Sequence, residues 1–273
     1  MNELTKRILF AVPAAAFFLY ITWLGGWIFT AVILLLALLM QYEMTAICTK
    51  AGFKPDRYFP YIIALWILLA PVLPYAFETG VALFLLFAAT QVFSSTGDDI
   101  RELVSTLFCG IYAPVGLLLF LKIRHLGSPE TGFVLTIALL LMVWGNDVFA
   151  YFGGRQFGRR PLAPSISPKK TWEGFFSGFI GSLAGLLIAF FLIPIPFPTT
   201  LVTALPLIVL VGIFGPIGDL TESKLKRAAG VKDASNILPG HGGFLDRFDA
   251  LILAAPTFYL YLYLLIQLDY VSL

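Results

Sequence analysis

The chain has 273 residues, of which 59% are hydrophobic and 12% are charged, whereas about 25% charged residues is ordinary for a soluble domain. A mean hydropathy of +0.89 with a net charge of +2 excludes an intrinsically disordered chain. Two cysteines, Cys48 and Cys109, are too few for a disulfide scaffold, and their apolar surroundings predict small buried side chains rather than a disulfide or a metal pair. The composition predicts a polytopic membrane protein.

Nine segments have the length and composition expected of membrane helices, which need roughly 17 to 25 residues. In chain order they are 8–23, 27–48, 58–76, 80–93, 105–121, 132–150, 173–193, 201–219 and 248–267. The fourth is short, so a half-helix or re-entrant segment is an alternative to a full span. Ala14-Ala15-Ala16 in the first segment raises the alternative of a cleavable signal peptide, although eight following spans favour an uncleaved one. Outer-membrane strands are excluded because residues 31–40 do not alternate.

The distribution of lysine and arginine tests the order of these spans, because cytoplasmic loops are enriched in both. With the N-terminus inside, 16 of the 18 basic residues fall on the inner side, and only Lys122 and Arg124 fall outside. The expected fold is therefore an all-α polytopic membrane protein with about nine transmembrane helices and a cytoplasmic N-terminus. Residues 1–104 are predicted to be a scaffold with dimer contacts, and residues 105–273 a catalytic region whose polar site faces the cytoplasm.

Five carboxylates lie at one predicted membrane level, at or inside the ends of the last four spans: Asp147, Glu173, Asp219, Asp246 and Asp249. An ionised carboxylate there is costly unless it is paired, solvated or bound to a cation. For any single carboxylate, a structural ion pair between helices is the alternative. Five carboxylates at the same level favour a functional site.

Helical spacing places several polar residues of the eighth span on one face. Glu222, Ser223 and Lys226 follow Asp219 at steps of three, four and seven. Pro216 stands just before Asp219 and is expected to interrupt the helix, which membranes tolerate where a cavity is lined. A kink that only shapes packing is the alternative.

The ninth span begins with two carboxylates, Asp246 and Asp249, spaced to point the same way. Carboxylates on converging helices suit a hard cation such as Mg²⁺, which prefers oxygen ligands and often shares them with substrate phosphates. A second metal ion or a monovalent cation is left open. Upstream, the glycines around His241 let the backbone approach a ligand and offer N–H groups to oxyanions, although a flexible turn explains the glycine content equally well.

The other long inner connection contains Ser167 and Pro168, which predict an N-cap and a first helical residue. Lys169 and Lys170 would then lie in the opening turn of a helix, where lysine opposes the helix dipole unless an anion also binds. Positive-inside anchoring is the alternative. Residues 153–158 lack the ending of a Walker loop and give only a weak indication of phosphate binding.

Glycines recur in the seventh span at alternating steps of four and three. This stripe predicts close packing against another helix, in the same chain or across a dimer. The stripe consists of Gly174, Gly178, Gly181 and Gly185.

The residues from Ser223 to Asp249 resemble a long, gapped family signature. They read Ser-Lys-Leu-Lys-Arg at 223–227, Lys-Asp-Ala-Ser at 232–235, and Leu-Pro-Gly-His-Gly-Gly-Phe-Leu-Asp-Arg-Phe-Asp at 238–249. The signature is that of CDP-diacylglycerol synthases, also called phosphatidate cytidylyltransferases, and no specified position departs from it. Residues 167–174 and 146–154 also resemble this family. The matches cover about 144–249, and the first half rests on no motif.

The resemblance implies a multi-helix membrane enzyme, commonly dimeric, that converts CTP and phosphatidate into CDP-diacylglycerol and pyrophosphate with Mg²⁺. It implies a prokaryotic cytoplasmic membrane, contact with membrane lipid and no nucleic-acid partner. It also implies that Asp219 and Asp246 resemble the family's metal-binding carboxylates.

Because two anions must meet, we expect cations and metal-binding acids rather than a general base. The metal ligands are predicted to be Asp219, Asp246 and Asp249. The phosphate clamps are predicted to be Lys169, Lys170, Lys226, Arg227 and Arg247, with Lys232 also contacting substrate. Ser223 and the backbone of His241, Gly242 and Gly243 would donate hydrogen bonds. Glu173 and Asp147 would orient a lysine or add ligands.

Two other functions fit parts of the pattern. A secondary transporter of an anionic metabolite would also use charged residues and broken helices, but its expected second broken segment is missing from the first half. A CTP-dependent lipid-alcohol kinase would share the nucleotide, but it would need a base for a neutral hydroxyl group.

Overall fold

The computed structural model describes residues 3–93, 100–238 and 240–271. Pro239 of the signature and the side chains of Lys6 and Arg7 lie outside the described residues. The helices are α1 Glu3–Leu24, α2 Gly26–Lys50, α3 Phe59–Leu69, α4 Ala76–Phe93, α5 Ile100–Arg124, α6 Pro129–Phe157, α7 Trp172–Phe191, α8 Leu201–Ala204, α9 Pro206–Ala228 and α10 Leu245–Gln267. The strands are β1 Pro161–Ala163 and β2 Ser167–Thr171.

Long apolar helices dominate the fold, which confirms the expected all-α membrane architecture. In the described part of the chain, seven helices are long and apolar enough to cross a membrane, and two shorter apolar helices cover Val12–Leu24 and Phe59–Leu69. The count of nine spans therefore stays a prediction.

The third and fourth segments differ from their expected lengths. Segment 58–76 was expected to span but forms only the 11 residues of α3, a rise of about 16 Å against a hydrocarbon core of about 30 Å. Pro71 and Pro74 explain this early end, because a proline has no backbone N–H group and cannot continue the hydrogen-bonded ladder. Segment 80–93 lies in the 18-residue α4, which is long enough to span.

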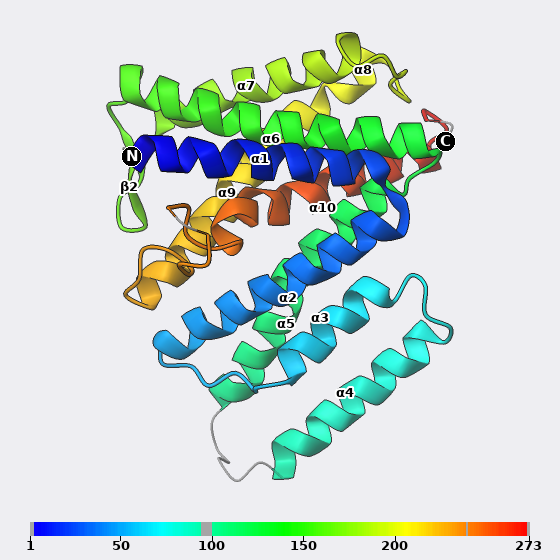
Figure 1. The fold of residues 1–273 in the computed structure, drawn as a ribbon, viewed down its shortest axis with the longest axis vertical. Helices are drawn as coiled ribbons and strands as arrows, with labels where there is room; N and C mark the ends of the chain where they lie inside the picture. Colours follow the sequence, from blue (N-terminus) through cyan, green and yellow to red (C-terminus); the bar gives the residue numbers. More distant parts are fainter. Residues whose placement is uncertain (1–2, 94–99, 239, 272–273) are drawn as a thin grey trace.

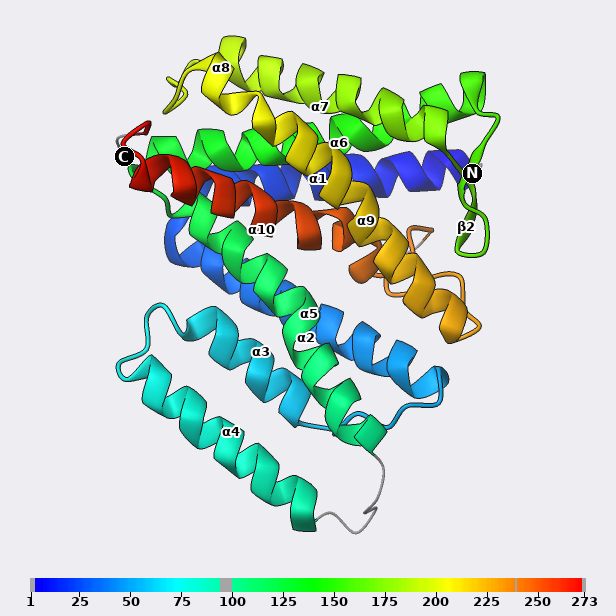
Figure 2. The ribbon, with the colours of Figure 1, turned by 180° about the vertical axis from the view of Figure 1, so that it is seen from behind.

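Successive long helices run back and forth, so their connections gather at two ends of the bundle (Figure 1). Connections 51–58, 158–171 and 229–244 lie at one end, which we call the hairpin end. Connections 70–75, 125–128 and 192–200 lie at the opposite end, as the reverse view also shows (Figure 2). Three basic connections predicted to share one side of the membrane thus share one end of the molecule.

The connection between α6 and α7 is a hairpin, not the start of a helix. Strands β1 and β2 pair antiparallel, with Pro161 opposite Thr171 and Ala163 opposite Ser167. Thr171 is the N-cap of α7, because its Oγ1 accepts a hydrogen bond from Gly174 N at 3.2 Å. The expectation that Ser167 caps a helix was wrong, because Thr171 supplies the cap four residues later and leaves both lysines on β2.

The glycine stripe of α7 packs against α6 within the chain. A Cβ atom added at Gly181 would overlap the Gly145 carbonyl, and one at Gly185 would overlap the Leu141 carbonyl. At Gly178 it would lie 2.7 Å from Asn146 Nδ2. These approaches confirm the predicted close helix packing, here within the same chain.

Helix α9 is continuous through Pro216, so the expected interruption before Asp219 is absent. Gly218 instead allows the crossing of α10, because a Cβ at this position would overlap the Asp249 carbonyl oxygen. The glycine therefore brings the two helices that carry the predicted carboxylates into backbone contact.

Aromatic side chains from α1, α2, α5 and α10 fill the centre of the bundle. Phe29, Phe120 and Phe258 are fully buried, and the ring centroids of Phe18 and Phe248 lie 5.4 Å apart. The two cysteines are free and buried between α2 and α5 with their Sγ atoms 3.3 Å apart, as expected of small core residues. This core fixes the start of α10 against α1 and α2.

Candidate functional site

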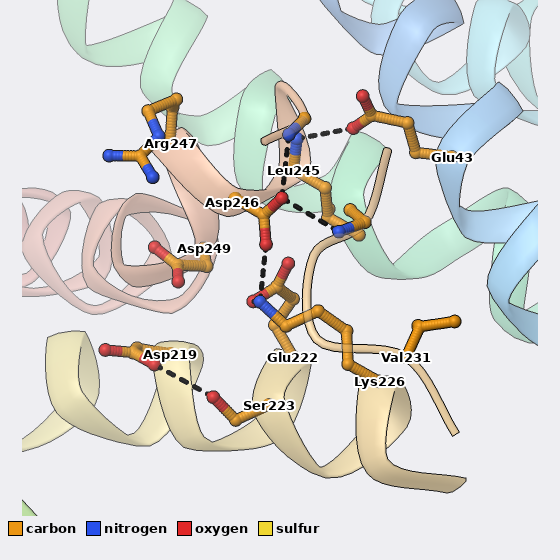
Figure 3. Close-up of polar contacts among 12 residues, drawn as sticks. Glu43, Asp219, Glu222, Ser223, Lys226, Val231, Leu245, Asp246, Arg247 and Asp249 are labelled. Atoms are coloured by element: carbon orange, nitrogen blue, oxygen red, sulfur yellow. Dashed lines mark hydrogen bonds and ion pairs between the residues drawn. The ribbon is translucent and has the colours of Figure 1, made fainter. Parts of the chain in front are cut away.

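Lys226, near the end of α9, binds two carboxylates from different elements (Figure 3). Its Nζ lies 2.6 Å from Glu222 Oε2 and 2.5 Å from Asp246 Oδ1. The three side chains are 10%, 0% and 5% exposed, respectively. Removing one member of such a buried set leaves an uncompensated charge, so Lys226 couples the end of α9 to the start of α10.

Asp246 also fixes the connection between these two helices. Its Oδ2 accepts hydrogen bonds from Ala234 N at 2.8 Å and Gly243 N at 2.7 Å. Gly242 has a φ of +78°, and an added Cβ there would lie 2.6 Å from the same oxygen. A glycine is therefore required at this turn for both conformation and space.

Glu43, on α2, enters the site from the first half of the chain. Its Oε1 accepts hydrogen bonds from Ser235 Oγ at 2.6 Å and Phe244 N at 2.9 Å, and its Oε2 accepts one from Leu245 N at 2.7 Å. The residue is fully buried. Glu43 and Asp246 together hold two neighbouring stretches of the 229–244 connection.

The Asp219 side chain contacts the hairpin and the next turn of its own helix. Lys170 Nζ donates to Asp219 Oδ2 at 2.5 Å, and Ser223 Oγ donates to Asp219 Oδ1 at 3.2 Å. The Lys170 and Asp219 side chains are 28% and 29% exposed. This pair is therefore partly accessible to solvent, whereas the ion pairs of Lys226 are buried. On the predicted face of α9, the contacts pair Asp219 with Ser223 and Glu222 with Lys226.

Asp249 lies on α10 opposite Asp219 on α9 (Figure 3). Its Oδ1 accepts a hydrogen bond from Ala250 N at 2.7 Å. Asp219 and Asp147 of α6 both add negative charge near Asp249. The site therefore has a concentration of negative charge with Lys170 at its border, which favours an added cation.

The remaining predicted cations lie at the exposed rim. Arg227 Nε donates to Ile166 O at 3.3 Å, and Arg247 Nε donates to His241 O at 3.0 Å. Both arginines are exposed, as are Lys169 and Lys232. These contacts to backbone carbonyls keep both guanidinium groups near the site and leave other N–H groups for a ligand.

Glu173 lies at the start of α7 and binds backbone. Its Oε2 accepts hydrogen bonds from Arg159 N at 3.0 Å and Arg160 N at 3.2 Å. An open cavity of about 340 Å³ lies beside it and is lined by Arg160, Trp172, Glu173 and Phe176. The residue thus fastens the end of α6 to α7, and its predicted contact with substrate stays a prediction.

The carboxylates fit a divalent cation only in part. Among the described residues, no three His, Cys, Asp or Glu side chains are arranged to hold a metal ion by themselves. The oxygens of Asp246 accept three hydrogen bonds, whereas those of Asp219 accept two and those of Asp249 accept one. Mg²⁺ is commonly held by one or two carboxylates, with water and substrate phosphates completing its shell. Asp219 and Asp249 fit that pattern.

Sequence reasoning missed Glu43, although a signal for it was present. It is a single acid in the long apolar segment 27–48, and an ionisable residue inside a membrane segment indicates function by default. Its partners lie about 200 residues away, so no local spacing connects it to them.

A family model described as the cytidylyltransferase family matches residues 5–265, nearly the whole chain. The chain belongs to this family. It is therefore an enzyme of the nucleotidyltransferase class, and the match covers the first half as well as the region of the signature.

Relatives of similar length support the same assignment. The chain is 36% identical to a phosphatidate cytidylyltransferase of Synechocystis over 290 aligned positions, with 96% of this chain and 97% of the relative covered. It is 34% identical to the protein of that name from Brucella abortus, covering 96% and 94%. It is 33% identical to the one from Bacillus subtilis, covering 95% and 97%.

Proposed function

We propose that this cytidylyltransferase acts on phosphatidate, converting it with CTP into CDP-diacylglycerol and pyrophosphate. Family membership, together with full-length similarity to relatives named for that reaction, carries the proposal. The site supports it because acids of α9 and α10 and exposed cations lie together at the hairpin end. The kinase and transporter alternatives have no comparable support.

The lipid phosphate is the nucleophile and attacks the α-phosphorus of CTP. A phosphate monoester is largely dianionic at pH 7 because its second pKa is about 6, so no general base is needed. The protein's task is to hold two anions in line and to neutralise their charge. Phosphate oxygens would be contacted from the hairpin, α9, α10 and the 229–244 connection, by Lys169, Lys170, Arg227, Arg247 and Lys232.

Other residues of the site contribute differently. Lys226 would reach a phosphate only by leaving Glu222 or Asp246, so its main contribution is to hold α9 against α10. Ser223 and the backbone at 241–243 would donate hydrogen bonds to substrate oxygens. Asp147, on α6, would restrain Lys170 through its charge.

Asp219 and Asp249 would hold Mg²⁺, with Asp246 joining them if Lys226 moves away. When bound, the metal supplies positive charge to the triphosphate and helps to orient it. Lys170 would then exchange Asp219 for a phosphate oxygen. Its 28% exposed side chain leaves room for that movement.

The setting follows from the lipid substrate. We place the protein in the prokaryotic cytoplasmic membrane with the hairpin end in the cytoplasm, because the basic connections gather there. CTP would enter from water and phosphatidate from the surrounding lipid between helices. A homodimer with contacts through the first spans remains part of the proposal, and no nucleic acid is involved.

One assay tests the reaction and separates the alternatives. Purified protein in detergent is given phosphatidate, a lipid alcohol such as diacylglycerol, Mg²⁺ and CTP labelled at either the α- or the γ-phosphate. We expect α-label in the lipid and γ-label in released pyrophosphate. γ-label in the lipid would mean a lipid kinase, and no labelled lipid would contradict both enzymes and leave transport.

A further inference from the structure

We infer that Glu43 is a positioning residue for cytidylyl transfer, which sets the start of α10 and the 229–244 connection from the other half of the chain. The inference rests on the proposed site. It begins from three hydrogen bonds to one fully buried carboxylate, donated by Ser235, Phe244 and Leu245. No substrate contact is required of Glu43 itself.

The carboxylate substitutes for a missing local cap. Phe244 occupies the N-cap position of α10 and makes no side-chain capping bond. Glu43 accepts the N–H groups of Phe244 and Leu245, which belong to the unpaired donors at a helix N-terminus. Its negative charge also complements the positive end of the helix dipole. A helix that lacks its own cap is thus capped from α2.

The position of this cap decides where the predicted metal ligands lie. Asp246 is one residue beyond Leu245, and Asp249 is one helical turn further, so both move with the N-terminus of α10. Glu43 and Asp246 take donors from adjacent residues on both stretches of the connection: Ser235 beside Ala234, and Phe244 beside Gly243. A shift of Glu43 would therefore be transmitted to Asp246.

The contact leaves no spare space. A Cβ atom added at Gly243 would overlap Glu43 Oε1, so any side chain at this position would displace the carboxylate. This gives a test of position that does not depend on removing Glu43. Gly243→Ala and Glu43→Asp should disturb the same contact.

The first experiment compares Glu43→Gln with Glu78→Gln, an exposed acid on α4 that serves as the matched control. The amide keeps the size of Glu43. Its NH₂ group cannot accept a hydrogen bond, so the three backbone and side-chain donors can no longer all be satisfied. We expect kcat per folded molecule to fall about 100-fold, as for a misplacement of about 1 Å, with KM for phosphatidate unchanged. The control should match wild type.

A purely structural role would give a different result. In that case the loss of activity would equal the loss of folded protein, measured by size-exclusion chromatography in detergent and by thermal unfolding, with kcat per folded molecule unchanged. That outcome overturns the inference. Absence of α-label transfer by wild type would instead overturn the proposed function, so the two failures are distinguishable.

The second experiment keeps the inference testable if Glu43→Gln fails to fold. Gly243→Ala alone should lower kcat by about 10- to 100-fold. In a Glu43→Asp background, which keeps a carboxylate but withdraws it from Gly243, the same change should add less than about a twofold loss, because residues in direct contact are non-additive. Multiplication of the two separate losses in the double variant would overturn the inference.

Discussion

The two ends of the helical bundle use buried charge in different ways. At the hairpin end, Lys226 is shared by Glu222 and Asp246, and the more exposed Lys170 reaches Asp219. At the opposite end, Arg124 is 3% exposed and donates to Thr22 O at 2.6 Å, Trp23 O at 3.1 Å and Pro129 O at 3.1 Å. At the hairpin end, charged side chains pair with one another, whereas at the opposite end one guanidinium group satisfies three backbone carbonyl groups.

Arg124 also explains an exception to the charge distribution. It is one of only two basic residues predicted on the outer side. Thr22 and Trp23 belong to the last turn of α1, whose carbonyl groups lack helical partners. The Arg124 guanidinium group packs over Gly25, where φ is +63° and an added Cβ would overlap it. Arg124 therefore caps the C-terminal end of α1 and is not a free charge in a connecting loop.

The largest effect is expected from Lys226→Met. Methionine retains a long apolar side chain but leaves Glu222 and Asp246 buried without their cation. The loss of a buried partner costs about 3–5 kcal/mol of stability. Thermal unfolding in detergent should show it, with Lys224→Met as an exposed control on the same helix. Equal stability of the two variants would contradict the buried ion pairs at the hairpin end.

Asp219→Asn should act on activity rather than on stability. It removes a charge from an exposed pair, and such pairs contribute about 0–1 kcal/mol. We expect kcat to fall at least about 100-fold, equivalent to about 2.7 kcal/mol in the barrier. A Mg²⁺ titration of α-label transfer measures it, with the exposed Asp269→Asn as control. Normal activity across the titration would remove Asp219 from the metal site.

Much of this arrangement could be predicted from local patterns. Apolar length predicted the helices, basic residues predicted which connections share an end, and helical spacing predicted that Ser223 and Lys226 share a face with Asp219. The steps of four and three predicted the packing of Gly181 and Gly185. Each pattern reports on interactions within one or two helical turns, or on the membrane itself.

The rest depends on contacts that sequence spacing does not encode. Ser167-Pro168 satisfies a local rule for a helix start, yet pairing with β1 makes the segment a strand. Lys226 and Asp246 were assigned to phosphate and to metal from their residue types, and only the fold brings them to each other. Glu43 has no neighbour in sequence that indicates its partners on α10.

Arg124→Ala should loosen the opposite end without affecting the chemistry. Removing three charge-assisted hydrogen bonds is expected to cost about 2 kcal/mol of stability. Arg124→Lys should recover only part of it, because one ammonium group lacks the fork that reaches several carbonyls. We expect unchanged kcat per folded molecule for both. A reduced kcat would mean that the two ends are coupled.

The smallest effect is expected from Cys109→Ala, which probes the contact between α2 and α5 without touching Glu43. The thiol is fully buried against Cys48, which lies about one helical turn beyond Glu43 on α2. Loss of one sulfur atom from the core should cost about 1 kcal/mol and leave kcat unchanged. If Glu43→Gln lowers kcat and Cys109→Ala only lowers the unfolding temperature, α2 acts on the site through its carboxylate rather than through its packing. A fall in kcat for Cys109→Ala, measured per folded molecule, would place the general packing of α2 among the determinants of the site and weaken the distinction between the two ends.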